Sequence, residues 1–140
     1  MTNATTVPAT AFHRSLAFWL AAVIGAFQAV NAVRAFADPS GFAAFYGTPI
    51  IDPRDIAFIY VYALRTSFIA ILVAFFLIRQ QVEALKWMAL AALVMPIGDA
   101  LLVTLAHGSP LTIARHVATA IYLGVTFLVF RRYLARTTAS

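Results

Sequence analysis

The chain has 140 residues, of which 63% are hydrophobic and 11% are charged, and its mean hydropathy is +0.89. A soluble domain of this length has too little interior to bury so much apolar surface, so the composition predicts a single domain in a lipid bilayer. Cysteine is absent, which excludes disulfides, thiol redox chemistry and cysteine metal sites. The net charge of +5 does not indicate nucleic-acid binding, because most of the basic residues flank the apolar runs.

The first expected membrane span covers about 15–34 and follows a Thr/Ala-rich tail, 1–14, that we expect to be disordered and cytoplasmic. Its start, together with the Ala-Phe-Ala sequence at 35–37, also fits a signal peptide with its cleavage site. However, the apolar run has roughly 18 residues, more than the usual ~7–15, and Gln28 and Asn31 interrupt it. We therefore expect a helix that is retained.

Residues 38–52 form the one long loop of the chain. Within it, Phe42, Phe45 and Tyr46 have i, i+3, i+4 spacing between two prolines. This spacing predicts a short amphipathic helix at the membrane interface. Two roles stay open for that helix, an interfacial anchor or a lid over the mouth of the bundle.

Three further spans follow, each with a recognisable start or end. Asp52-Pro53-Arg54-Asp55 supplies an N-cap, a proline at N1 and an acid at N3, and the span after it runs to residue 78. A short turn leads to a third span over 84–106, which Gly108 ends, and Ser109-Pro110 opens a fourth that ends near residue 130. Because two connections are short, the expected fold is all-α, an integral membrane antiparallel four-helix bundle over 15–133 with a cytoplasmic tail at 134–140.

The basic residues are divided unequally between the two ends of this bundle. The end that carries both termini has Arg14, Arg79, Lys86, Arg131, Arg132 and Arg136. The other end has Arg34, Arg54 and Arg115, beside Asp38, Asp52 and Asp55. The positive-inside rule therefore predicts a multi-pass protein of the cell inner (plasma) membrane with both termini in the cytoplasm.

Arg65 lies in the middle of the second span, and a cation at that depth costs roughly 2.5–3.5 kcal/mol unless it faces protein or water. Asp99 is the only acid deep within a span, so an Arg65–Asp99 ion pair is the first expectation. Arg115 and His116 are the alternative partners of Asp99. Whether such a pair only stabilises the bundle or also serves a function stays open at this point.

The other polar side chains of the spans lie at a similar depth, between the bilayer midplane and the outer surface, as judged from a rise of about 1.5 Å per residue. Pro96 is expected to kink the third span one turn before Asp99 and to turn it towards these groups. Because four helices contribute, we predict one polar pocket that opens outward. Its predicted catalytic residues are His116, Asp99 and Arg65. Its predicted ligand-binding residues are Gln28, Asn31, Arg65, Tyr62, Arg115, Thr112 and Thr119.

Neither a metal nor an organic cofactor is expected in this pocket. His107 and His116 do not share a helix face at i, i+4 spacing, and the neighbouring arginines would repel a cation. The chain also has no phosphate loop, nucleophile elbow or dinucleotide fingerprint.

Several features occur in an order that resembles a family of small four-helix membrane proteins of the DoxX-like kind, known as a domain of unknown function. They are the sequence Phe45-Tyr46-Gly47-Thr48-Pro49, Arg65, Asp99, Gly108 and His116. The resemblance covers roughly 15–133 and departs at Thr66, where an acidic or amide residue is expected. It implies a four-helix bundle, and by analogy with anthrone-oxygenase-like bundles it points to lipophilic aromatic ligands.

The sequence thus leads to one preferred function and two alternatives. In the preferred interpretation, the pocket binds a small lipophilic molecule: Arg65 holds an oxygen, His116 exchanges a proton and Asp99 orients one of them. Whether the pocket also transforms its ligand, and so whether the protein is an enzyme, is left open. The alternatives are a proton-coupled exporter that works as a homo-oligomer with Asp99 as its proton site, and an accessory subunit without enzymatic activity.

Overall fold

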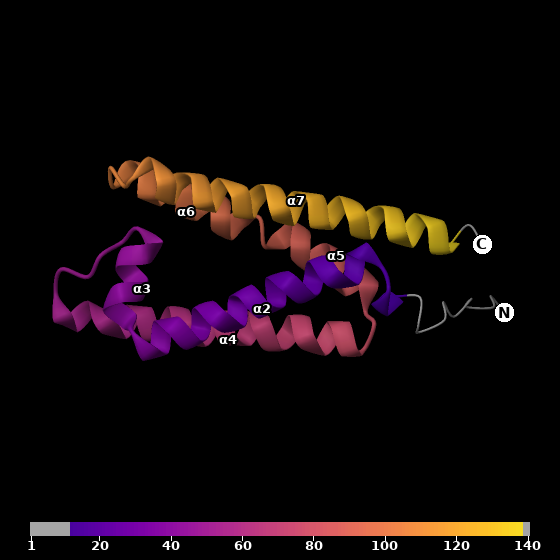
Figure 1. Cartoon of the computed structure of the whole chain (residues 1–140), viewed down its shortest axis with the longest axis horizontal. Helices are drawn as coiled ribbons and strands as arrows, with labels where there is room; N and C mark the ends of the chain where they lie inside the picture. Colours follow the sequence, from indigo (N-terminus) through magenta and orange to yellow (C-terminus); the bar gives the residue numbers. More distant parts are fainter. Residues whose placement is uncertain (1–11, 139–140) are drawn as a thin grey trace.

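A computed structural model of the chain describes residues 12–138, which form helices and no strand (Figure 1). The helices are α2 (Leu16–Ala37), α3 (Pro39–Tyr46), the 3₁₀ helix η1 (Pro53–Asp55), α4 (Ile56–Ile78), α5 (Val82–Ala91), α6 (Val94–Leu105) and α7 (Pro110–Thr138). Four segments are long and apolar enough to cross a bilayer, namely Leu16–Ala37, Pro53–Ile78, Val82–Leu105 and Pro110–Thr137. The predicted all-α, four-span bundle is confirmed.

Large apolar side chains point away from the bundle along all four spans. Phe58 is 72% exposed, Ile71 69% and Leu111 63%, although each lies within a membrane-length helix. In water this surface would cost far more than the small buried core returns, so the solvent around it is lipid. The chain is a multi-pass integral membrane protein.

Side-chain caps explain why the helices begin where they do. The hydroxyl of Ser15 accepts a hydrogen bond from the Phe18 amide at 3.2 Å, and α2 begins at the next residue. Asp52 accepts from the Arg54 amide at 2.9 Å, so the predicted start forms as η1 and continues into α4. These are the groups that satisfy amides left unpaired in a first helical turn.

The third span differs from the continuous helix expected over 84–106, because it is broken into α5 and α6 at Ala92 and Leu93. Pro96 explains the break, since its ring has no amide hydrogen for the Ala92 carbonyl and would collide with it. The hydrogen bonding there changes to i→i+3 spacing instead, and Met95 N donates to the Ala92 carbonyl at 3.2 Å. The kink expected from Pro96 is therefore present, and it is sharp enough to end one helix.

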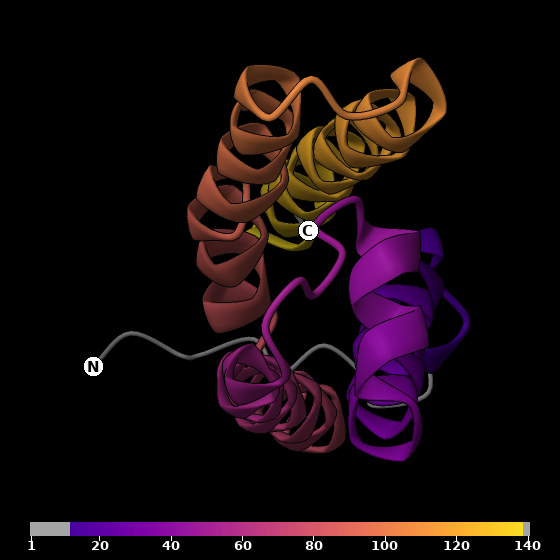
Figure 2. The same cartoon turned by 90° about the vertical axis from the view of Figure 1, so that its left-hand side faces the viewer.

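The spans form two layers. Helices α2 and α4 lie side by side in one layer, and α6 and α7 lie side by side in the other (Figures 1 and 2). In the first layer the helices approach closely at Gly25, where a Cβ atom would lie 2.9 Å from Val73 Cγ1. Contacts of α2 with α7 and of α4 with α5 join the layers.

An apolar core holds the two layers together at the end of the bundle where α2 begins and α7 ends. Its buried members come from all four spans and from the segment before α2: Phe12, Ala17, Ala21, Val73, Leu77, Leu85 and Phe130. We call these residues the lower core. Helix α3 lies at the opposite end (Figure 1).

Helix α3 is built into the bundle rather than lying loosely on it. The carboxylate of Asp38 accepts from the Gly41 amide at 2.9 Å and caps the helix start. Phe42 is 2% exposed and packs in a cluster with Ala35 of α2 and Ala63 of α4. Gly47 ends the helix with φ of 101°, and a Cβ atom there would lie 2.5 Å from Thr112 Cγ2 of α7. Glycine is thus required both by backbone conformation and by the closeness of α7.

Helix and packing extend past the predicted spans at both ends of the chain. The fourth span was expected to end near residue 130, but α7 continues to Thr138. Tyr133 explains part of the extension, because it still packs against the lower core. At the other end, Phe12 is only 2% exposed, so the folded region begins within the predicted tail 1–14; the rest of that prediction, over residues 1–11, lies outside the described residues, as does the end of the tail at 139–140.

Candidate functional site

A cavity of about 610 Å³ lies between the two layers, and helices α2 to α7 all contribute to its wall. The nine candidate residues from the sequence all line it. They are Gln28, Asn31, Tyr62, Arg65, Asp99, Thr112, Arg115, His116 and Thr119. The structure thus brings together groups from four spans that lie far apart in the chain.

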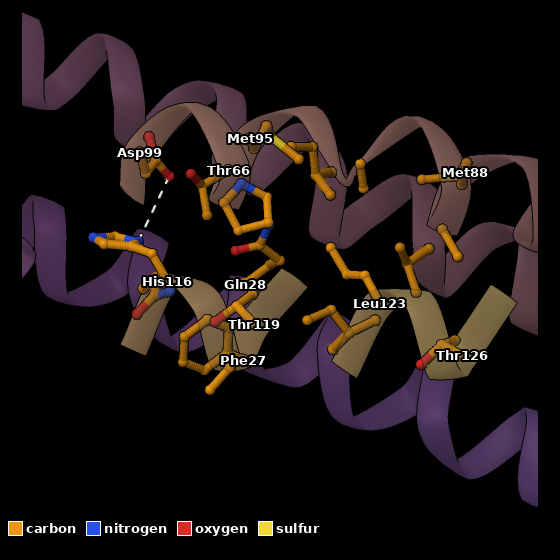
Figure 3. A pocket seen from close by; sticks show the side chains of 18 of the residues that line it. Phe27, Gln28, Thr66, Met88, Met95, Asp99, His116, Thr119, Leu123 and Thr126 are labelled. Atoms are coloured by element: carbon orange, nitrogen blue, oxygen red, sulfur yellow. Dashed lines mark ion pairs between the residues drawn. The ribbon is translucent and has the colours of Figure 1, made fainter. Parts of the chain in front are cut away.

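The cavity changes from polar to apolar along its length. Figure 3 shows Asp99, His116 and Thr66 at one end, with Met88 and Leu123 towards the other. On α4, Arg65, Ile69 and Val73 line the cavity at successive steps of four residues, so they follow one helix face from the polar to the apolar end. The apolar end reaches the lower core, since Val73, Leu85 and Phe130 belong to both.

Asp99 is held by α3 and α7 rather than by the arginine of α4. The Tyr46 hydroxyl donates a hydrogen bond to Asp99 Oδ2, and His116 Nδ1 lies 3.9 Å from the same oxygen. The expected Arg65–Asp99 ion pair does not form, because no ion pair among residues 12–138 includes Arg65. Of the alternative partners, His116 is the one that the structure selects. We call Tyr46, Asp99 and His116 the clip.

The two ring nitrogens of His116 face different groups of the clip. Nε2 lies 3.2 Å from the Tyr46 carbonyl oxygen, which can only accept, so Nε2 carries a hydrogen. The other ring nitrogen, Nδ1, faces the carboxylate of Asp99 at 3.9 Å, so the imidazole lies between α3 and α6.

Neighbouring residues of α7 also satisfy the last carbonyls of α3. Arg115 Nη1 donates to the Phe45 carbonyl at 3.4 Å, while His116 takes the Tyr46 carbonyl. These carbonyls have no partner within α3, and the C-terminal end of a helix favours cations. Arg115 and His116 therefore cap α3 from another helix, which fixes α3 to the layer formed by α6 and α7.

Two guanidinium groups stack on one aromatic ring beside the clip. Arg34 of α2 and Arg115 of α7 lie 4.5 Å and 4.4 Å from the centre of the Phe45 ring. Each contact is a cation–π interaction, worth about 0.5–1 kcal/mol at exposed sites. Phe45 thereby connects the two layers at the α3 end, as the lower core does at the other.

Sequence reasoning did not include Tyr46 among the site residues, although it is central to the clip. The spacing of Phe42, Phe45 and Tyr46 indicated the helix but not which layer the tyrosine would reach. Burial raises the pKa of Tyr46 above its ordinary value, and the neighbouring Tyr62 and Asp99 raise it further. The phenol is therefore a neutral donor towards Asp99.

A second group of polar side chains in the cavity has no such partners. Gln28 and Asn31 of α2 and Arg65 of α4 line the wall, yet none forms a side-chain hydrogen bond or ion pair with any residue that the structure describes. Asn31 is nevertheless only 5% exposed. We call these three residues the open group, because their donors and acceptors are available to a molecule in the cavity.

Within the described part of the chain, no cluster of three or more His, Cys, Asp or Glu side chains could hold a metal ion.

A family model, described as Domain of unknown function (DUF4267), matches residues 25–130. That match includes every residue of the clip and of the open group. No curated protein and no solved structure matches the chain.

Proposed function

The chain belongs to the family that this model describes, a domain of unknown function, and on that premise we propose a function from the site itself. We propose that the protein binds a small lipophilic molecule in the cavity between its layers. The observation that carries the proposal is the cavity, which combines an apolar end with unpartnered polar groups at the other end. Its volume lies within the range of about 300–1,000 Å³ that is typical of ligand pockets.

The two groups of polar residues support different roles. In the clip, the partners of Asp99 and His116 are protein groups, which suits a structural role for these residues beside the ligand. The open group suits direct contact with the ligand, since its donors and acceptors line the cavity and have no partner among the residues that the structure describes. The geometry therefore supports binding, while the catalytic assignment of His116, Asp99 and Arg65 stays a prediction.

Filling the cavity should abolish binding. We expect Ala89→Phe, on the cavity wall of α5, to lose a small molecule that copurifies with the wild-type protein in mild detergent. Native mass spectrometry measures the bound mass. The matched control is Ala91→Phe on the same helix, where the side chain is exposed and does not line the cavity.

The result decides between clear alternatives. Loss of the bound mass in Ala89→Phe and its retention in Ala91→Phe support the proposal. A wild-type protein that carries no bound molecule after gentle purification contradicts it. The exporter interpretation would then be tested by pH-dependent flux in liposomes, which should be lost in Asp99→Asn. The accessory-subunit interpretation would be tested by crosslinking in native membranes.

We also propose that the protein lies in the cell inner (plasma) membrane with both termini cytoplasmic, so that the polar end of the cavity is on the outer side. The support is the excess of basic residues at the end opposite α3. Kinship with DoxX-like proteins is likewise a proposal that rests on the sequence pattern.

The chain has no cysteine, so a single introduced thiol reports its orientation cleanly. Ile51, in the turn between α3 and η1, is 94% exposed. We expect an impermeant maleimide to label Ile51→Cys in intact cells, while Arg136→Cys at the other end is labelled only after lysis. The reverse pattern would overturn the orientation.

A further inference from the structure

The charges around the polar end of the cavity do not balance. Arg65 of α4 and Arg115 of α7 both line the wall, and Asp99 is the only carboxylate among the lining residues. Asp99 faces Tyr46 and His116, and no ion pair among residues 12–138 joins it to either arginine. The cavity wall therefore carries an excess of positive charge.

The two arginines differ in how far their charge is already compensated. Arg115 lies against the Phe45 ring and donates to the Phe45 carbonyl, so the protein itself provides partners for its guanidinium. Arg65 has neither kind of contact within residues 12–138. A cation within a membrane span is unfavourable unless it meets protein, water or an opposite charge, and an anion in the cavity would supply that charge.

The surroundings of Arg65 indicate the shape of such an anion. Gln28 and Asn31 line the same cavity with free carboxamide groups, whose N–H donors can hydrogen-bond an oxyanion. Arg65, Ile69 and Val73 lie on one face of α4, and the cavity wall becomes apolar at Ile69 and Val73. An ion such as free phosphate or chloride would leave this apolar part of the cavity unfilled.

We propose that the cavity takes an amphiphile with a single anionic head, a carboxylate or a phosphate, whose head pairs with Arg65 and whose apolar chain lies along Ile69, Val73 and Leu123. This inference rests on the proposed function and names the class of its ligand. A guanidinium forms two parallel hydrogen bonds with either head, which makes the pairing directional as well as electrostatic.

A comparison of two ligands that differ only in the head tests the proposal. The protein is placed in phosphatidylcholine nanodiscs at pH 8, and the binding of radiolabelled palmitate and of hexadecanol is measured against empty nanodiscs. We expect palmitate to bind the wild type at least ten-fold more tightly than hexadecanol. In Arg65→Gln we expect this preference to fall below about three-fold, with the affinity for hexadecanol unchanged.

Two variants serve as controls for charge and for fold. Arg65→Lys keeps the charge and should keep most of the preference. Arg79→Gln removes a positive charge at the end of the same helix, away from the cavity wall, and should behave as wild type.

Adding phosphatidylglycerol to the nanodiscs identifies the source of the anionic head. Displacement of palmitate indicates a bilayer lipid, whereas no displacement indicates a free amphiphile. Either result agrees with an anionic head.

The failure of this inference can be told apart from the failure of the proposed function. If palmitate and hexadecanol bind the wild type equally, or if Arg65→Gln keeps the preference, the anionic head is overturned. Saturable binding of both ligands that is lost in Ala89→Phe would then leave the proposed cavity function in place. If neither ligand binds, both proposals are overturned.

Discussion

Replacing Asp99 with alanine should lower the free energy of unfolding by about 2–4 kcal/mol and should release α3 from the layer formed by α6 and α7. The carboxylate accepts from the Tyr46 hydroxyl and faces His116 Nδ1, and alanine leaves the hydroxyl without an acceptor and the imidazole without its neighbouring carboxylate in a mostly buried site. Each unsatisfied buried polar group costs about 1–3 kcal/mol. Chemical unfolding in micelles measures the loss, and hydrogen exchange of the α3 amides measures the release.

Asp55→Ala is the matched control for this prediction. Asp55 is an acid at the same end of the bundle, is exposed and makes no side-chain cap bond, so its loss should cost less than about 1 kcal/mol. Asp99→Asn should fall between, because an amide oxygen still accepts from Tyr46 but gives His116 no charge. An Asp99→Ala protein with unchanged stability and unchanged exchange in α3 would show that the clip does not hold the helix.

The second large effect is expected at the opposite end of the cavity. Phe130→Ala should destabilise the protein by about 3–5 kcal/mol, because the ring is only 1% exposed and belongs to the lower core that joins the layers. The loss should also open the apolar end of the cavity. Thermal unfolding in detergent measures the first effect, and weaker retention of the copurifying molecule measures the second.

A nearby residue on the same helix provides the comparison for Phe130. Leu128 is 49% exposed on the lipid-facing side, so Leu128→Ala should change the free energy of unfolding by less than about 1 kcal/mol. Equal effects of the two substitutions would mean that the lower core does not join the layers in the way described above.

Most of the fold could be predicted from the sequence because few signals in it compete. Apolar runs of membrane length give the spans, and the Asp52-Pro53 and Ser109-Pro110 pairs give two of their starts. The break in the third span was predicted only as a kink. The sequence gives the position of Pro96 but does not show whether the helix before it bends or is interrupted. The extension of α7 to Thr138 depends on Tyr133 meeting the lower core, which is a tertiary contact.

The site could be predicted by depth but not by direction. Counting residues along a helix shows how deep each polar group lies, and the nine candidates do line one cavity. The rotation of each helix about its own axis is set by packing, so the sequence could not decide which cation meets Asp99. It favoured Arg65, whereas α7 turns His116 towards the carboxylate.

The role of α3 was the least predictable part of the site. The spacing of its aromatic residues allowed either an interfacial anchor, whose aromatic face enters the bilayer, or a lid, whose aromatic face packs on the protein. The position of α3 is set by residues of the other layer. Asp99 accepts a hydrogen bond from the tyrosine of α3, and Arg115 and His116 contact its last carbonyls. Contacts of this kind join residues 53 to 70 positions apart and leave no local sequence signal.

The most direct measurement is an experimental structure of the protein extracted with its native lipids, at a resolution that shows bound molecules. We predict one elongated density between the layers, with its head between Arg65 and His116 and its chain reaching Leu123. A cavity closed by packed side chains, or an Arg65 side chain turned out to lipid with nothing bound between α4 and α7, would contradict the account.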